Sequence, residues 1–193
     1  MQIELSQFLL TLSQAFTLLL PITFAGLCLI ICMRKGWLEK LDVPLDGGLK
    51  LGGQPLIGKS KSFRSLIIYL LVATLVTLLL HSSAQVSDLV APVFLTNPFV
   101  LGPDITLSYL LGEIVNSFIK RRLGIAASGK ALSRWGSRVQ SIFDNLDGII
   151  SSGLLFIFIY QVSAETLITA FALSVLIHLS TDLLMRKLQL KRK

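Results

Sequence analysis

Residues 112–148 contain the side chains whose types and spacing best suit catalysis or the binding of a charged ligand. Glu113 interrupts an apolar run, which ends in a basic cluster at residues 120–122. Asp144 and Asp147 open the next apolar run, and a helix would place both carboxylates on one face because they are three residues apart. Carboxylate oxygens are preferred ligands of Mg²⁺, and lysine and arginine bind phosphate groups. The combination indicates a site for a metal ion and a phosphate compound.

A glycine-rich basic segment, PLDGGLKLGGQPLIGKSKSFRS, lies upstream at residues 44–65. Closely spaced glycines allow backbone amides to approach an anion. Lys59, Lys61 and Arg64 lie near the end of this segment and add positive charge. We therefore expect this segment to contribute to the same phosphate site.

The elements that position these side chains are predicted to be membrane helices. Hydrophobic residues make up 53% of the 193 residues and charged residues 15%, a composition too apolar for a soluble domain of this size. Pro92, Pro98 and Pro103 predict an irregular approach to the third helix. No internal repeat or linker divides the chain, so residues 1–193 are expected to form a single all-α membrane-embedded domain. Apolar runs predict five transmembrane helices, at residues 8–33, 65–83, 105–119, 144–162 and 166–184.

The basic residues determine the expected topology. All eighteen lysines and arginines fall in residues 34–64, 120–138 and 186–193, and the positive-inside rule places these three segments in the cytoplasm. Two predicted helices separate each basic segment from the next, so the N-terminus is expected outside the cell and the C-terminus in the cytoplasm. The site would then lie at the cytoplasmic face of the cell membrane. The net charge of +7 is assigned to orientation and to anionic ligands, and no nucleic-acid partner is expected.

The pattern Gly-acid-x-x-x-Ser-x-x-Lys-Arg, followed about two dozen residues later by Asp-x-x-Asp, is met by Gly112, Glu113, Ser117, Lys120, Arg121, Asp144 and Asp147. It resembles the signature of the CTP-dependent lipid-phosphate cytidylyltransferases, the phosphatidate cytidylyltransferase superfamily. Residues 44–65 are similar to the Asp-Gly-Gly and Gly-Lys-Gly-Lys-Thr-Trp-Arg-Gly segments of the CDP-archaeol synthases, a branch whose small five-helix size also fits. Glu113 stands where the family usually has aspartate, and serines replace two glycines of the basic segment.

The resemblance implies a Mg²⁺-dependent nucleotidyltransferase that makes a CDP-activated lipid, of the CDP-archaeol or CDP-diacylglycerol type, for phospholipid biosynthesis. A lipid phosphate from the membrane would attack CTP and release pyrophosphate. Glu113, Asp144 and Asp147 would hold the metal, and Lys120 and Arg121 would join the two aspartates as catalytic residues. The implied nucleotide- and phosphate-binding residues are Asp46, Gly58, Lys59, Lys61, Arg64, Ser117, Lys120 and Arg121. The implied partners are CTP, the lipid phosphate and membrane lipids.

Two other kinds of function stay open at the level of the sequence. A non-catalytic membrane protein could retain this fold and bind nucleotide or lipid, and Glu113 in place of the usual aspartate suits that alternative. A small transporter could use carboxylates within the membrane, although the sequence has no inverted repeat and no pair of carboxylates near a midplane. Asp144 and Asp147 could also be helix N-terminal charges that the helix dipole stabilises. The basic residues could serve only to set topology.

Overall fold

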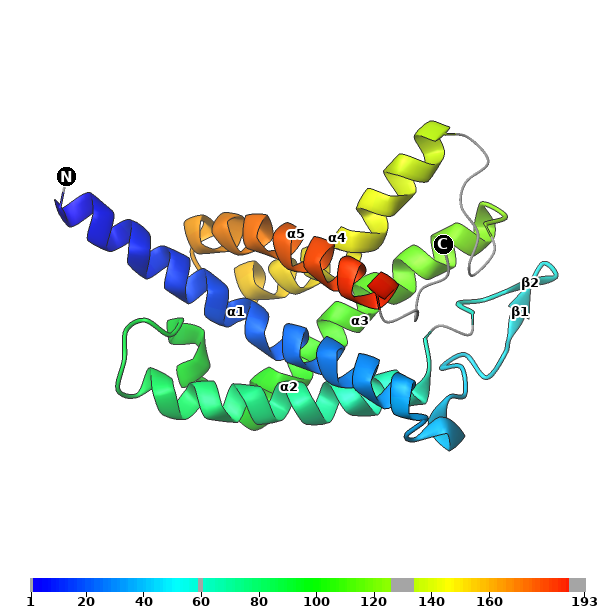
Figure 1. Cartoon of the computed structure of the whole chain (residues 1–193), viewed down its shortest axis with the longest axis horizontal. Helices are drawn as coiled ribbons and strands as arrows, with labels where there is room; N and C mark the ends of the chain where they lie inside the picture. The colour runs from blue at the N-terminus through cyan, green and yellow to red at the C-terminus, as the bar shows by residue number, and fades with distance from the viewer. Residues whose placement is uncertain (1, 59–60, 126–133, 188–193) are drawn as a thin grey trace.

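The computed structural model describes residues 2–58, 61–125 and 134–187, and helices dominate it (Figure 1). The helices are α1 (Gln2–Lys35), α2 (Phe63–Ala84), α3 (Pro98–Arg122), α4 (Arg134–Phe158) and α5 (Ala164–Lys187). Two short 3₁₀ turns, η1 (Glu39–Leu41) and η2 (Pro92–Leu95), and two strands, β1 (Lys50–Leu51) and β2 (Gln54–Pro55), lie between them. The predicted all-α class therefore holds except for this small hairpin.

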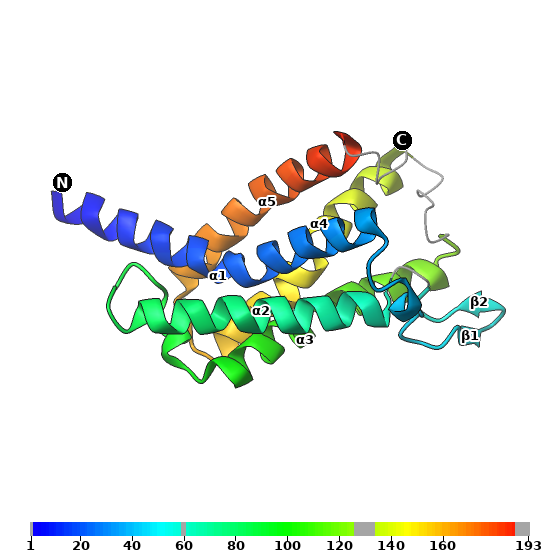
Figure 2. The same cartoon turned by 60° about the horizontal axis from the view of Figure 1, so that its bottom comes forward.

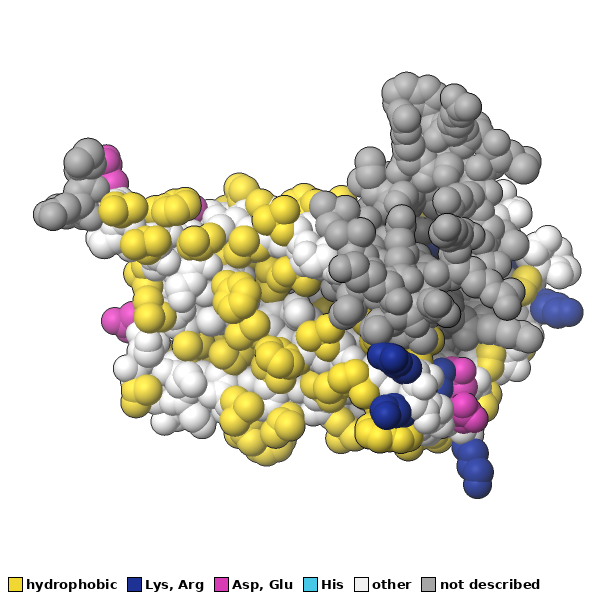
Figure 3. Space-filling model, viewed as in Figure 1, with side chains coloured by type: hydrophobic (Ala, Val, Ile, Leu, Met, Phe, Trp, Pro, Cys, Tyr) yellow, Lys and Arg dark blue, Asp and Glu magenta, His cyan; other side chains and the backbone are white. Residues whose placement is uncertain are grey.

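Three of the described helices, α1, α2 and α3, are long and apolar enough to cross a membrane. Two shorter apolar stretches, Leu146–Phe158 in α4 and Ala164–Ile177 in α5, match the fourth and fifth predicted spans. Large apolar side chains such as Leu71 and Phe99 are 67% exposed, as expected for helices whose outer surface faces lipid. Hydrophobic side chains cover the middle of the described surface, and the lysines and arginines visible there gather at one end (Figure 3). The chain is therefore built as a multi-pass membrane protein.

The third helix begins earlier than the apolar run predicts, at Pro98 and not at residue 105. Asn97 caps it by accepting a hydrogen bond from the backbone N–H of Phe99, 2.9 Å away. Pro98 occupies the first helical position, where a missing N–H has no cost. The expected irregular approach thus lies before Pro98, in residues 85–97, which include η2, whereas Pro103 lies inside α3.

The fourth helix also begins early, at Arg134, ten residues before Asp144. Asp144 and Asp147 therefore lie within α4 and not at its N-terminus. The interpretation of these aspartates as helix N-terminal charges is wrong, because the dipole effect is confined to the first turn. In Figure 1 the first half of α4 extends away from the other helices, and only its second half joins them.

The helices run back and forth between two ends of the molecule. α1 packs against α2 and α5, while α3 packs against α2 and α4 (Figures 1 and 2). The N-terminus lies at the end opposite the β1–β2 hairpin, and α5 runs toward the same end as the hairpin without reaching it (Figures 1 and 2). Glycine permits the close α2–α3 contact, since a Cβ at Gly102 would lie 2.6 Å from the Cα of Thr74.

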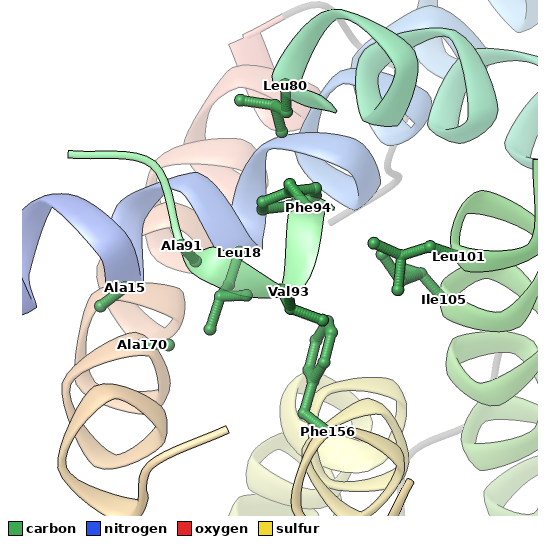
Figure 4. Close-up of a cluster of buried hydrophobic side chains, with 10 residues drawn as sticks. All are labelled: Ala15, Leu18, Leu80, Ala91, Val93, Phe94, Leu101, Ile105, Phe156 and Ala170. Atoms are coloured by element: carbon green, nitrogen blue, oxygen red, sulfur yellow. The ribbon is translucent and has the colours of Figure 1, made fainter. Parts of the chain in front are cut away.

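The largest buried apolar cluster lies at the end remote from the hairpin (Figure 4). Phe94 of η2 is fully buried there, between α2 and α3 on one side and α1 on the other. Polar contacts reinforce this end, because the Gln14 amide donates to the carbonyl of Asp88 at 3.0 Å. The cluster consists of Ala15, Leu18, Leu80, Ala91, Val93, Phe94, Leu101, Ile105, Phe156 and Ala170.

The opposite end carries the glycine-rich loop. Strands β1 and β2 pair antiparallel, with Lys50 opposite Pro55, and Gly52 and Gly53 form the two-residue turn between them. Both glycines have positive φ, 59° and 77°, as a tight hairpin turn requires. The loop returns to the membrane at Ser62, whose hydroxyl caps α2.

Candidate functional site

Lys61 and Glu113 form an ion pair between the glycine-rich loop and α3. The Lys61 Nζ lies 2.6 Å from the Glu113 Oε2, and the two side chains are only 16% and 21% exposed. A carboxylate in an apolar helix needs such a partner, because an unpaired buried charge is strongly destabilising. The expected acidic residue of α3 and the expected lysine of the loop are thus brought together, although they are 52 residues apart.

Asp147 of α4 faces the same region and is held from two sides. Its Oδ2 accepts a hydrogen bond from the Asn116 side-chain amide at 2.7 Å, and its Oδ1 accepts one from the backbone N–H of Gly148 at 2.6 Å. Glu113 and Lys61 lie within electrostatic range of this carboxylate. Asn116 was not predicted as a site residue, although its position three residues after Glu113 places it on the same helix face.

Gly112 explains how the two carboxylates come together. A Cβ at this position would overlap the backbone carbonyl of Asp147 and would lie 2.8 Å from the Ser151 Cβ. No residue larger than glycine fits without moving a helix. The glycine beside the acidic residue therefore permits the α3–α4 crossing that sets Glu113 next to Asp147.

The described carboxylates suit a hard cation. Glu113 and Asp147 present oxygen atoms from adjacent helices, and oxygen is the donor type that Mg²⁺ selects. Within the side chains that the structure describes, no three acidic, histidine or cysteine residues form a metal-binding group. The Asp144 side chain lies outside the described set, but its backbone position in α4 is one turn before Asp147.

Asp46 organises the glycine-rich loop. Its Oδ1 accepts a hydrogen bond from the Gly48 N–H at 2.9 Å, and its Oδ2 accepts bonds from the N–H groups of Ile57 at 2.8 Å and Gly58 at 3.2 Å. Burial disfavours the charged carboxylate, but the hydrogen bonds outweigh burial and hold the pKa of Asp46 below its usual value. Asp46 acts on the loop backbone through these bonds.

Two arginines at the end of α3 hold the loop in place. Arg121 is 3% exposed, donates to the backbone carbonyl of Ile125, and lies so close to Gly58 that a Cβ there would be 3.2 Å from its Nε. Arg122 donates to the carbonyls of Leu51 at 2.6 Å and Pro55 at 2.9 Å. Arg121 was expected to bind phosphate, but the described contacts of both arginines are with the protein itself.

The other described residues of the predicted site lie around the Lys61–Glu113 pair and make contacts of their own. Arg64, in the first turn of α2, pairs with Asp42 of the loop at 2.8 Å. Ser117 is buried on α3, one turn after Glu113, and Lys120 follows near the end of the helix. Lys59 lies outside the described residues. The structure therefore brings together Lys61, Glu113 and Asp147, with the other described members of the predicted set around the adjoining loop.

An apolar cavity of about 540 Å³ lies among the helices, and its lining includes Ile149, two residues after Asp147. Side chains of α1, α3, α4 and α5 line it, and Tyr69 of α2 closes one wall. Tyr109 of α3 belongs to the same lining and lies one helical turn before Glu113. The polar site and the apolar cavity thus share a boundary.

A family model for CarS-like CDP-archaeol synthases matches residues 12–193. The chain belongs to the CDP-archaeol synthase family. The CDP-archaeol synthase of Methanococcus aeolicus is 30% identical over 153 residues, which cover 77% of this chain and 80% of that protein. The synthase of Hyperthermus butylicus is 27% identical over 153 residues, with 77% and 79% covered.

A solved structure shares the fold of this CDP-archaeol synthase family member. It is described as an intramembrane enzyme for archaeal membrane lipid biosynthesis, and it matches with a TM-score of 0.63 at 23% identity. The match covers 88% of this chain and 92% of the solved one. The family resemblance carried by the two sequence motifs is confirmed, and neither a transporter nor a non-catalytic binding protein is favoured.

Proposed function

We propose that this protein is a CTP-dependent cytidylyltransferase that converts a membrane lipid phosphate into a CDP-activated lipid. The observation that carries the proposal is the pair of carboxylates, Glu113 and Asp147, set beside Lys61 of the glycine-rich loop, with an apolar cavity that is lined by Tyr109 one helical turn before Glu113. A water-soluble nucleotide and a lipid must meet at such a boundary. Membership of the CDP-archaeol synthase family supports the same reaction.

In this reaction an oxygen of the lipid phosphate attacks the α-phosphorus of CTP. The bond from that phosphorus to the oxygen bridging the α- and β-phosphates breaks, and pyrophosphate leaves with the bonding electrons. Such a transfer requires the protein to align the two phosphates and to neutralise their charge. Lys61 lies 2.6 Å from Glu113, so it brings a cation to the centre of the site.

Glu113 and Asp147, together with Asp144 one turn earlier in α4, are the residues that would hold Mg²⁺. The bound ion would supply neutralisation of phosphate charge. Asn116 and the Gly148 N–H fix the orientation of the Asp147 carboxylate. These contacts reduce the freedom of Asp147, so its oxygens are held ready for a ligand.

The triphosphate is assigned to the loop side of the site. Lys59, Lys61 and Lys120 are proposed to contact phosphate directly, with Ser117 beside them. Asp46, Gly58, Arg64 and Arg121 are proposed to shape the loop that receives the nucleotide, because their described contacts lie within the protein.

The lipid is assigned to the membrane side. The cavity of about 540 Å³ has an almost wholly apolar lining, which suits hydrocarbon chains. We propose that the hairpin end lies in the cytoplasm and the N-terminus outside, because the described basic residues of the loop and of α3 lie at the hairpin end. The lipid phosphate would then meet CTP at the cytoplasmic face.

The test is an assay of the purified protein in detergent with labelled CTP and Mg²⁺. An isoprenoid glycerol phosphate and phosphatidate are supplied in parallel, and a reaction without lipid phosphate is the control. We expect a labelled lipid product and release of pyrophosphate with at least one of the two lipids. Failure to form product with either lipid, by a protein that binds CTP, would favour a non-catalytic relative.

A further inference from the structure

Tyr69 and Tyr109 form a stacked pair in the interior of the helix bundle. Their ring centroids are 5.7 Å apart with an angle of 16° between the ring planes, and the residues are only 8% and 6% exposed. Tyr69 comes from α2 and Tyr109 from α3. A buried tyrosine needs a partner for its hydroxyl, because an unpaired polar group in an apolar interior is costly.

Glycines on two other helices make room for this pair. A Cβ at Gly148 of α4 would lie 2.5 Å from the Tyr109 ring, and a Cβ at Gly26 of α1 would lie 3.3 Å from the Tyr69 hydroxyl. Four helices therefore converge on the two phenols. The absence of side chains at these two glycines leaves the space that the tyrosines occupy.

The pair stands between the apolar cavity and the carboxylates. Both tyrosines line the cavity. The Tyr69 ring stacks on the Tyr109 ring, and Tyr109 and Glu113 lie one helical turn apart on the same face of α3, where phenol and carboxylate interact electrostatically. The pair therefore leads from the cavity to Glu113, which is paired with Lys61.

We propose that Tyr109, itself held by Tyr69, is a positioning residue for the reacting site. Glutamate has three side-chain torsions, so its carboxylate needs restraint before it can serve as a well-placed ligand. Lys61 restrains the Glu113 carboxylate from the loop side, and the Tyr109 hydroxyl restrains it from the cavity side. The inference rests on the proposed function, in which Glu113 holds the cation that neutralises phosphate.

Substitution by phenylalanine separates this role from simple packing. Tyr109→Phe keeps the ring, the stacking with Tyr69 and the fit against Gly148, and it removes only the hydroxyl. Tyr160→Phe is the matched control, because the Tyr160 hydroxyl donates to the Asp104 carboxylate at 2.5 Å, remote from the site. Both variants lose one phenol–carboxylate contact.

The first measurement is kinetic. Groups that orient a metal ligand are worth about 10–100-fold in activity or metal affinity, so Tyr109→Phe should lower kcat by about that factor while KM for CTP changes little. Tyr160→Phe should keep the wild-type kcat. In a Glu113→Gln background Tyr109→Phe should have little further effect, because the group that it positions is already lost. A Tyr109→Phe enzyme with wild-type kcat would overturn the inference while leaving the proposed function intact.

The second measurement does not depend on turnover. The melting temperature of each variant is recorded in detergent with CTP as Mg²⁺ is raised. Tyr109→Phe should need about 10–100-fold more Mg²⁺ than wild type for the same stabilisation, and Tyr160→Phe should not. Equal Mg²⁺ dependence in all three proteins would refute the positioning role. If the melting temperature of the wild-type protein did not change with Mg²⁺ or CTP, both this inference and the proposed function would be wrong.

Discussion

Single residues at the site are held by partners from other elements. Asp147 is fixed by Asn116 of α3 as well as by the N–H of Gly148, and Glu113 is fixed by Lys61 of the loop. Each acidic residue thus depends on a contact that joins two segments of the chain. The acidic residues could be predicted because charge in an apolar run is conspicuous. Asn116 and Tyr109 could not, because polar and aromatic residues are common in membrane helices and only the packing shows what they touch.

Asp147→Asn should lower cytidylyl transfer by at least about 100-fold, because it removes a charge from the proposed metal ligand at constant size. The assay is product formation at saturating CTP and lipid phosphate. Asp104→Asn, which changes a carboxylate of α3 near Tyr160, should retain activity. Near-normal turnover of the Asp147 variant at high Mg²⁺ would remove this residue from the metal site.

Asp46 predicts a pH dependence of loop stability. Its folded-state pKa lies below the usual value of about 4, so its charge stabilises the loop above that pH and the stabilisation is lost as the pH falls through the folded-state pKa. Asp46→Asn should lower the melting temperature at pH 7 by about 2–4 °C, the equivalent of roughly 1 kcal/mol.

The comparison for Asp46 is a series of melting temperatures between pH 7 and pH 3. Wild type should lose more stability than Asp46→Asn over the acidic part of this range. Glu165→Gln, a change at an exposed carboxylate of α5, should follow the wild-type curve. Parallel curves for wild type and Asp46→Asn would show that the hydrogen bonds to Asp46 contribute nothing to stability.

Among the elements, the α3–α4 crossing is the contact on which the site depends. Alanine normally stabilises a helix relative to glycine by about 1 kcal/mol. At Gly112 the opposite is expected, because an added methyl group meets the Asp147 backbone. Gly112→Ala should destabilise the protein by about 1–3 kcal/mol and should also lower activity by separating the two carboxylates.

Gly153→Ala provides the control for this prediction. Gly153 also lies within α4, but a Cβ there has no neighbour within 4 Å. This variant should melt at the same temperature as wild type or slightly higher. If Gly112→Ala and Gly153→Ala melted at the same temperature in detergent, the close crossing would not be a determinant of stability.

The positions of the helices could be predicted from the sequence, whereas the start of α4 and the contacts of the arginines could not. The apolar runs located all five helices, since hydrocarbon-spanning length is a strong signal. The first ten residues of α4 were missed because residues 134–143 mix charged, polar and apolar side chains and carry no continuous apolar run. Arg121 suggested phosphate binding by its charge, but it donates to the nearby carbonyl of Ile125. The carbonyl partners of Arg122, Leu51 and Pro55, lie 71 and 67 residues away in the sequence and cannot be read from it.

At the scale of the whole molecule, the two ends differ in character. The lysines and arginines visible in Figure 3 gather at the end where Figure 1 places the hairpin, whereas the N-terminus lies at the other end. The arrangement supports the orientation proposed from the basic segments. In that proposed orientation, with the N-terminus outside, the loop, the end of α3 and the end of α5 would all lie in the cytoplasm.

Cysteine labelling in intact cells tests this orientation. Val86→Cys places a thiol at a position that is 85% exposed between α2 and η2, and Leu49→Cys places one at a 64% exposed position in the loop. Cys28 and Cys32, both in α1, are first replaced by alanine. A membrane-impermeant maleimide should label Val86→Cys directly and Leu49→Cys only after the membrane is permeabilised. The reverse pattern would show that the site faces outward.

The buried cluster remote from the hairpin joins the first membrane helix to the last. Ala15 of α1 and Ala170 of α5 both belong to it, and the two helices pack along each other. Ribosomes deliver α1 to the membrane long before α5, so during biogenesis the face of α1 that packs against α5 lacks this partner until the last helix is made. The cavity therefore becomes enclosed only when the final helix has been inserted, and a chain arrested before that point has the motif residues but no compartment for the lipid.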